Sequence, residues 1–170
     1  TNALVDEYYE KYDILLEGRD PKEFKKHVEI RGLEKILENQ KNKTGGIIHI
    51  GHLTNWEAFG LAVSVEGVDK AVLAQRMDNP YVDEETNRLR NIFGGNTFYS
   101  NHDANPFVAC VRWIKKGKMI GILTDQNILS TDFFMNFLGR PAAMSPITAL
   151  LSIRLQVPVF PVLVTRENGK

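Results

Sequence analysis

The amino-acid sequence predicts an α/β domain with a mostly parallel central sheet flanked by helices. Short apolar runs alternate with helical stretches of about a dozen residues, and this alternation is typical of parallel strands joined by crossover helices. Three of the expected helices begin at a small polar residue followed by proline, a pattern that favours a helix start. The chain has 170 residues, 43% of them hydrophobic, which is enough for one domain with its own core.

Residues 1–40 are expected to form a helical N-terminal part. The stretch "LVDEYYEKYDILL" is amphipathic, and a second helix is predicted from Asp20 as the N-cap, with Pro21 in its first turn. Gly32 interrupts the apolar face of this second helix. The turn-forming letters "NKTGG" then separate the helical part from an α/β core expected at residues 45–166.

Strands and helices are expected to alternate through the core. The predicted strands cover residues 46–50, 70–74, 96–100, 118–124, 133–137 and 157–164. The predicted helices begin at Thr54 or Asn55, at Asn79, at Asn105 and at Ser145. Pro161 lies inside the last apolar run and indicates an edge strand or a bulge, because proline cannot donate a sheet hydrogen bond. We predict a single domain over residues 1–170, cut at both ends, since the chain starts at Thr1 rather than at methionine.

The composition disfavours several classes of protein. Lysine plus arginine equals aspartate plus glutamate, so the net charge is zero and nucleic acid is not an expected partner. The single cysteine, Cys110, excludes an internal disulfide framework and a cysteine-rich metal site. No apolar run reaches the ~18 residues of a membrane span, and no signal peptide is visible.

The stretch "GIIHIGHLTNWEAFG" places a histidine and an acid at the mouth of a strand. His52 follows the apolar run, and Glu57 lies in the first turn of the next expected helix. The two side chains can face each other, so that the carboxylate fixes the imidazole tautomer while the second ring nitrogen acts as a base. The sequence has no Gly-x-Ser-x-Gly elbow, so a substrate hydroxyl is the expected nucleophile.

Two other interpretations of this motif stay open. An acid such as Glu57 also stabilises a helix N-terminus through the helix dipole, and His52 is then an ordinary loop residue. His49, His52 and Glu57 have the residue types of a metal site, but strand alternation sends the two histidines to opposite faces and no fourth ligand accompanies them. We therefore expect no metal.

Five blocks of sequence follow one another over roughly residues 30 to 166. They are "GGIIHIGHLTNWEAFGLA", "QRMDNPYVDEETNRLRNIFGG", "GILTDQN", "FFMNFLGRPAAMSP" and "VPVFPVLVTR". In this order they resemble the bacterial lipid A biosynthesis acyltransferases, the late lauroyl and myristoyl transferases, within the superfamily that carries a His-x4-Asp/Glu motif. The chain departs from the family at Leu53 and Thr54, where the family often has an aromatic residue and glycine.

The resemblance implies a glycerolipid-acyltransferase-like fold and a reaction. In that reaction a fatty acyl chain moves from an acyl carrier protein thioester to a hydroxyl of a lipid A precursor, with His52 as the general base and Glu57 as its orienting acid. The implied partners are acyl carrier protein, a lipid acceptor and a membrane surface. No cofactor is expected, because the acyl carrier protein thioester or acyl-coenzyme A is a co-substrate. The implied location is the cytoplasmic face of the inner membrane, peripherally or through a segment missing from this chain.

Five further residues are predicted to bind substrate. Lipid A precursors carry phosphates, which favour arginine because its planar fork binds two oxygens. Arg76 ends a strand at the ligand edge of the sheet, Arg90 lies on the following helix, and Arg140 lies in the block "LGRPA". Asp125 and Gln126 end another strand, where they line the acceptor site or brace an arginine; a plain Asx turn is the alternative.

Other functions remain as alternatives. The same core can acylate a different acceptor, such as a lysophospholipid, glycerol phosphate, a mannosylated phosphoinositide or an ornithine lipid. A catalytically silent lipid-binding module keeps the fold and binds acyl chains without turnover. Slow thioester hydrolysis, by water activated at His52, is a fourth alternative.

Overall fold

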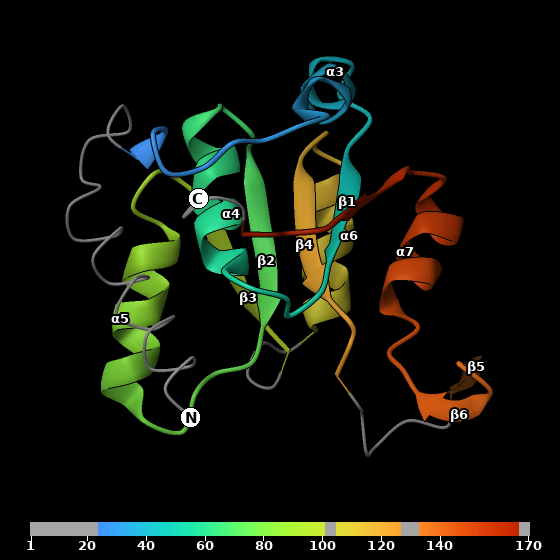
Figure 1. Cartoon of the computed structure of the whole chain (residues 1–170). Helices are drawn as coiled ribbons and strands as arrows, with labels where there is room; N and C mark the ends of the chain where they lie inside the picture. The colour runs from blue at the N-terminus through green and yellow to red at the C-terminus, as the bar shows by residue number, and fades with distance from the viewer. Residues whose placement is uncertain (1–23, 101–104, 127–132, 167–170) are drawn as a thin grey trace.

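The computed structural model describes residues 24–100, 105–126 and 133–166, and Figure 1 shows how its elements are arranged. The first amphipathic stretch and the predicted cap at Asp20 and Pro21 lie outside the described residues. The division into a helical part and a core therefore stays a prediction, while the alternation of strands and helices in the core is observed directly.

Five parallel strands form the central sheet, in the order β3-β2-β4-β1-β7. They are β1 (Gly46–Ile50), β2 (Lys70–Ala74), β3 (Asn96–Tyr99), β4 (Met119–Leu123) and β7 (Val159–Val162). β1 and β4 lie inside the sheet and are almost wholly buried, which explains their nearly unbroken apolar sequences. β7 lies at the edge, as Pro161 predicts, so the predicted α/β class with a parallel sheet is confirmed.

Five helices accompany the sheet in the described part of the chain. They are α3 (Leu33–Lys41), α4 (Trp56–Val65), α5 (Pro80–Arg90), α6 (Pro106–Ile114) and α7 (Ile147–Leu155). The side-chain oxygens of Asn55, Asn79 and Asn105 each accept a backbone N–H in the first turn of α4, α5 and α6. An asparagine in this position satisfies a donor that the helix leaves open, so the predicted starts of these helices are confirmed. Gly32, with φ of 80°, directly precedes α3 and breaks the longer helix expected there.

The helices cover both faces of the sheet (Figure 1). On one face α6 and α7 pack against Ile47 and Ile120, and on the other α3 and α4 pack against Ile48 and Met119. Neighbouring residues of one strand thus enter different layers, as the two-residue repeat of a strand requires. Cys110 of α6 is fully buried in the first layer, and burial raises the pKa of its thiol to about 11.

A small hairpin extends from the same chain without joining the sheet. The predicted strand at residues 133–137 is present as β5 (Phe134–Phe137), but it pairs antiparallel with β6 (Arg140–Ala143) instead of extending the parallel sheet. Leu138 and Gly139 form the turn, both with positive φ, of 51° and 80°. That backbone suits a two-residue hairpin turn, and glycine adopts it without strain whereas leucine does not.

The carboxyl ends of β1, β2 and β4 meet at one edge of the sheet, the lower edge in Figure 1. The β5–β6 hairpin lies below the same edge, on the side of α7. Ligands of open parallel sheets bind where strands end and helices begin. The fold therefore predicts that chemistry takes place at this lower edge.

Candidate active site

The candidate site lies in the loop between β1 and α4. The strand ends at Ile50, and Gly51 and His52 are the first residues beyond it. Asp125 lies at the corresponding place after β4, the neighbour of β1 in the sheet. Because Ile50 is paired with Leu123 at the ends of these strands, the two loops emerge side by side.

His52 and Asp125 make a two-point contact. The backbone N–H of His52 donates to Oδ2 of Asp125 at 2.6 Å, and Nδ1 of the imidazole lies 2.6 Å from Oδ1. A carboxylate only accepts, so the shared proton belongs to Nδ1 and the lone pair is left on Nε2. The ring also packs edge-on against Trp56, with 4.9 Å between ring centroids. The His52 side chain is 29% exposed, so part of it is open to solvent.

Asp125 is held in the ionised form by the same contact. Its partial burial acts to raise the pKa of the carboxyl, but the hydrogen bonds from the ring and backbone of His52 outweigh this, and the pKa lies below its usual value. A side chain at the neighbouring residue would crowd this contact. A Cβ on Gly51 would lie 3.1 Å from Oδ2 of Asp125, closer than ordinary van der Waals contact.

The loop after His52 contains a strained residue. Thr54 has φ of 49°, in the left-handed region that a β-branched side chain rarely adopts. Its hydroxyl donates to the carbonyl of Val164, beyond β7, at 3.0 Å. The loop thus keeps a shape suited to glycine, although threonine occupies the position, and the hydroxyl fastens it to the edge of the sheet.

Glu57 is engaged in a different ion pair. Arg90, at the end of α5, places Nη2 at 2.6 Å from Oε1 of Glu57, while its Nε contacts both carboxylate oxygens at 3.0 and 3.1 Å. The two side chains are only 12% and 17% exposed for Glu57 and Arg90. This forked contact joins the first turn of α4 to the last turn of α5.

Lys70, the first residue of β2, adds a second cation to this ion pair. It is 4% exposed, and the loss of solvent lowers its pKa to about 8. The charge of Glu57 acts to raise that pKa and the charge of Arg90 to lower it, so the three groups form one electrostatic cluster. Lys70 was not among the site residues predicted from the sequence, where it is only the polar start of an apolar strand.

The structure corrects the predicted pairing of the motif. The carboxylate on Nδ1 of His52 is Asp125 and not Glu57, and the guanidinium of Arg90 forks onto Glu57. The physical reason is the direction in which each carboxylate points. Glu57 lies in the first turn of α4, with its carboxylate turned to α5, whereas Asp125 comes off the adjacent strand end beside His52. Asp125 was predicted as a lining or bracing residue, and what it braces is the histidine.

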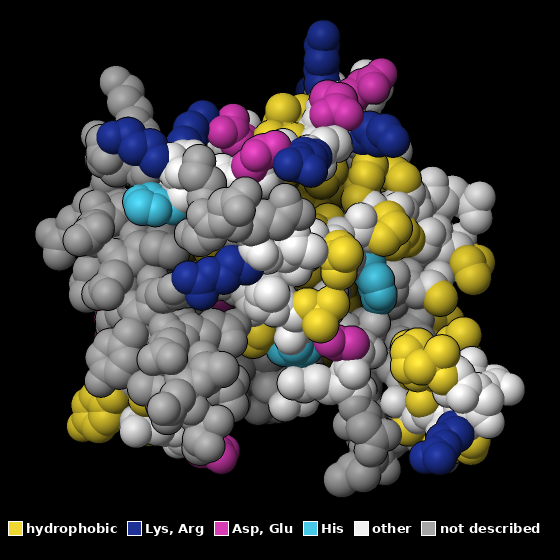
Figure 2. All heavy atoms as spheres, in the orientation of Figure 1, with side chains coloured by type: hydrophobic (Ala, Val, Ile, Leu, Met, Phe, Trp, Pro, Cys, Tyr) yellow, Lys and Arg dark blue, Asp and Glu magenta, His cyan; other side chains and the backbone are white. Residues whose placement is uncertain are grey.

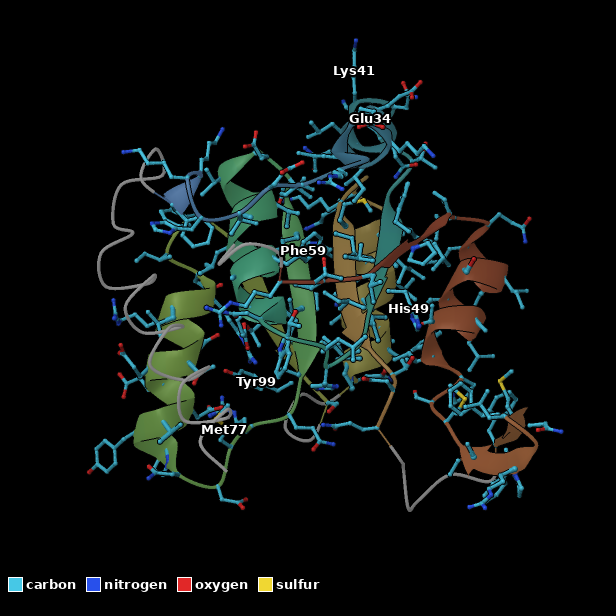
Figure 3. All side chains as sticks on the ribbon, in the orientation of Figure 1. Glu34, Lys41, His49, Phe59, Met77 and Tyr99 are labelled. Atoms are coloured by element: carbon cyan, nitrogen blue, oxygen red, sulfur yellow. The ribbon has the colours of Figure 1, made fainter. Side chains whose placement is uncertain are left out.

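Three other residues were predicted to bind substrate. The guanidinium of Arg76 lies 4.6 Å from the ring centroid of Tyr99, the last residue of β3, which Figure 3 labels near the carboxyl ends of the strands. Gln126 directly follows Asp125 and is exposed, and Arg140 is exposed at the start of β6. Their binding roles stay predictions.

The structure does not bring His49, His52 and Glu57 together as metal ligands. His49 points to α7, where its Nδ1 lies 3.3 Å from the hydroxyl of Thr148, and Figure 3 shows it on that side of β1. Over residues 24–100, 105–126 and 133–166, no three His, Cys, Asp or Glu side chains are grouped as metal ligands. The helices of that same part of the chain are each too short or too polar to cross a bilayer.

An imidazole held by a carboxylate at the end of a parallel strand defines a site for base-assisted chemistry on an α/β fold. Comparison with known proteins specifies the class. The sequence model of the bacterial lipid A biosynthesis acyltransferases matches residues 13–170, and the chain belongs to this family.

Two curated relatives agree with the family assignment. The chain is 28% identical over 148 residues to "Lipid A biosynthesis acyltransferase 2" of Shigella flexneri, covering 85% of the chain and 46% of that protein. It is 28% identical over 156 residues to "Lipid A biosynthesis acyltransferase" of Haemophilus influenzae, covering 89% of the chain and 48% of that protein. The chain thus spans about half the length of the relatives it matches.

Proposed function

We propose that the protein is an O-acyltransferase that moves a fatty acyl chain from an acyl carrier protein thioester to a hydroxyl of a lipid A precursor. The single observation that carries the proposal is the contact of His52 with Asp125, which leaves Nε2 of an accessible imidazole as a base at the ligand edge. Family membership and the names of the two relatives support the reaction class.

The proposed reaction needs a base and a proton carrier. Nε2 of His52 takes the proton of the acceptor hydroxyl while that oxygen attacks the thioester carbonyl, and the new C–O bond forms. The imidazolium then returns the proton to the departing sulfur as the C–S bond breaks. Base catalysis of this kind contributes about 10²- to 10⁴-fold to the rate. Asp125, ionised and on Nδ1, stabilises the charged ring between the two steps.

Two exposed arginines support an acceptor that carries phosphate. Arg76 lies two residues beyond the end of β2, and Arg140 begins β6 of the hairpin that Figure 1 shows below the same edge. A guanidinium binds two phosphate oxygens at once, which a lysine cannot do. The guanidinium of Arg90 is bound to Glu57, so Arg90 is not one of the proposed phosphate ligands.

The β5–β6 hairpin has a composition suited to contact with a membrane surface. Its apolar side chains are unusually exposed: Phe134 at 61%, Phe137 at 62% and Leu138 at 88%. Figure 2 shows hydrophobic side chains gathered beside a cationic side chain at the lower right of the molecule, where Figure 1 places this hairpin. Arg140 is the single charged residue in the segment 133–143, so the hairpin matches an apolar layer bordered by anionic headgroups.

A vesicle assay tests the membrane surface. The double variant Phe134→Asp with Phe137→Asp is expected to lose most sedimentation with vesicles of phosphatidylethanolamine and phosphatidylglycerol. Tyr81→Asp, on α5 and 81% exposed, is the control for an exposed apolar residue away from the hairpin and is expected to sediment as the wild type does. Equal sedimentation of all three proteins would remove the hairpin from the membrane contact.

The acyltransferase proposal is tested by transfer of labelled acyl chains from acyl carrier protein to a lipid A precursor. His52→Ala is expected to lower kcat by about 10²-fold or more while the circular dichroism spectrum is retained. His27→Ala is the control, because His27 is an exposed histidine outside the site. A His52→Ala protein with wild-type kcat would overturn the proposal.

The same assay separates the alternatives when the acceptor is varied. Transfer only to a lysophospholipid, glycerol phosphate, a mannosylated phosphoinositide or an ornithine lipid would keep the chemistry and replace the acceptor. Acyl-chain binding without turnover on any acceptor would identify a lipid-binding module. Release of free fatty acid that is unaffected by acceptor would identify a hydrolase.

A further inference from the structure

We propose that a water molecule is bound inside the protein, next to Gly95, where β2, β3 and the end of α5 meet. The water accepts hydrogen bonds from the ammonium of Lys70 and the hydroxyl of Thr97. It donates one hydrogen bond to the side-chain oxygen of Asn91 and one to the backbone carbonyl of Arg90. This hydration site goes beyond the proposed function and does not depend on it.

The buried ammonium of Lys70 is the first group that needs a partner. Lys70 is 4% exposed, and over the part of the chain that the structure describes its Nζ has neither a hydrogen bond nor an ion pair. Both oxygens of Glu57 are bound by Arg90 instead. Two glycines flank the ammonium, because a Cβ on Gly60 would lie 3.9 Å from Nζ and a Cβ on Gly95 would lie 3.4 Å from it. A buried cation without hydrogen bonds is costly, so we expect a polar partner at this place.

Two buried oxygens in the same region also need a partner. Among the described residues, neither Oδ1 of Asn91 nor Oγ1 of Thr97 has a hydrogen bond. The orientation of the Asn91 amide is fixed by its nitrogen, because Nδ2 donates to the backbone carbonyl and the side-chain oxygen of Asn87. Oδ1 is therefore an acceptor that points elsewhere. Nearly all buried polar atoms of proteins bind either another protein group or an ordered water, and this favours a water as the partner of both oxygens.

These groups converge on the side of Gly95 that carries no side chain. A Cβ at Gly95 would lie 3.3 Å from the carbonyl oxygen of Arg90 and 3.4 Å from both Oδ1 of Asn91 and Nζ of Lys70. Thr97 follows Gly95 by two residues, and the register of β3 on β2 places Thr97 on the same face of the sheet as Lys70. One small molecule next to Gly95 can therefore contact all four groups.

The chemistry of the four groups selects water rather than an ion. The ammonium and the hydroxyl donate, whereas the amide oxygen and the backbone carbonyl accept. Water accepts two hydrogen bonds and donates two, so it complements this set. An anion would face the two acceptors, and a cation would face the ammonium of Lys70. Buried waters typically make about three hydrogen bonds to polar groups that have no other partner, and this site offers such groups.

A high-resolution crystal structure of the wild type is the direct test. A water peak is expected at about 2.7–3.2 Å from Nζ of Lys70, from Oδ1 of Asn91 and from the carbonyl oxygen of Arg90. Gly95→Ala places a methyl group among these atoms and should lose the peak. Gly94→Ala is the matched control and should keep it, because Gly94 also has a positive φ but a Cβ there would meet nothing within 4 Å. A wild-type structure in which Lys70 contacts Asn91 directly, with no water between them, would overturn the proposal.

Thermal unfolding of Thr97→Val gives a second test, which also decides the question if Gly95→Ala does not fold. Valine keeps the shape of the threonine side chain and removes only the hydroxyl. If that hydroxyl binds the water, its loss should lower the melting temperature by about 3 °C. If the hydroxyl has no partner, valine removes a costly buried polar atom, so a raised or unchanged melting temperature would contradict the proposal. Neither test measures acyl transfer, so failure here leaves the proposed function in place.

Discussion

Two carboxylates lie near the carboxyl edge of the sheet, and they are used in opposite ways. Asp125 is 43% exposed and contacts a histidine that is 29% exposed, whereas Glu57 is 12% exposed and is paired with a partly buried arginine that is 17% exposed. The first pair is open to a substrate, and the second lies between two helices. Glu57 is five residues from His52 in the sequence and Asp125 is 73 residues away, yet the distant residue makes the contact.

These two ion pairs show how a parallel sheet assembles a site. Adjacent strand ends deliver residues from distant parts of the chain to one place, and a helix that starts there turns its side chains to its own neighbours. The motif spacing therefore identifies the loop correctly without identifying the partner of the histidine. We expect the Asp125 pair to control rate and the Glu57 pair to control stability, which the following variants test.

The largest expected effect is on the Glu57 pair. Arg90→Met should lower the free energy of unfolding by about 3 kcal/mol, because it leaves a shielded carboxylate without its forked partner. Arg88→Met is the matched control two residues away: Arg88 pairs with Glu85 and is 52% exposed, so its removal should change stability by less than about 1 kcal/mol. Urea unfolding at neutral pH measures both. Equal losses in the two variants would contradict a separate role for the shielded pair.

Burial of Lys70 predicts a change of similar size in the free energy of unfolding at alkaline pH. The pKa of Lys70 is about 8 in the folded protein and near its ordinary value of 10.5 in the unfolded chain, so the unfolded chain binds more protons between these values. The contribution of Lys70 to the free energy of unfolding therefore rises by about 3 kcal/mol as the pH increases from about 8 to about 10.5. Lys70→Met removes the rise.

Unfolding of the wild type and of Lys70→Met at pH 7.5 and pH 10.5 measures the effect of Lys70. The difference between the two proteins isolates Lys70 from the tyrosines and other lysines that titrate in the same range. On going from pH 7.5 to pH 10.5, the wild type should gain stability relative to Lys70→Met. A difference that stays constant across the two pH values would contradict the buried position of Lys70.

The smallest expected effect concerns the strained loop beside His52. Thr54→Val keeps the left-handed backbone and loses the hydrogen bond to Val164, which should lower stability by about 1 kcal/mol. Thr54→Gly loses the same bond but relieves backbone strain of about 1 kcal/mol or more, so it should be close to the wild type. Thermal unfolding separates them. A glycine variant less stable than the valine variant would show that the backbone is not strained.

The fold was largely predictable because its signals are local. The asparagine caps before α4, α5 and α6 and the apolar runs of β1 and β4 each act within a few residues, and they appear where expected. The pairing of β5 was not predictable from its own letters. Whether "FFMNF" joins the sheet or forms a hairpin depends on the turn at Leu138 and Gly139, where leucine gives no signal for positive φ.

The candidate site was predictable in its residues and not in its contacts. His52, Glu57, Asp125 and Arg90 were all identified from the sequence, but their pairing is set by strand order and helix packing. Lys70 carried no signal, since a lysine at the start of a strand is normally solvated. Its burial follows from its place next to Glu57 and Arg90, which only the folded chain brings together.

A double-mutant cycle on kcat for acyl transfer tests the central claim most directly, with the wild type, His52→Ala, Asp125→Asn and the double variant. A residue that works only through the histidine has no effect once the histidine is gone. The double variant should therefore be as slow as His52→Ala alone. If the two losses multiply, Asp125 acts independently of His52, and the account of this site is wrong.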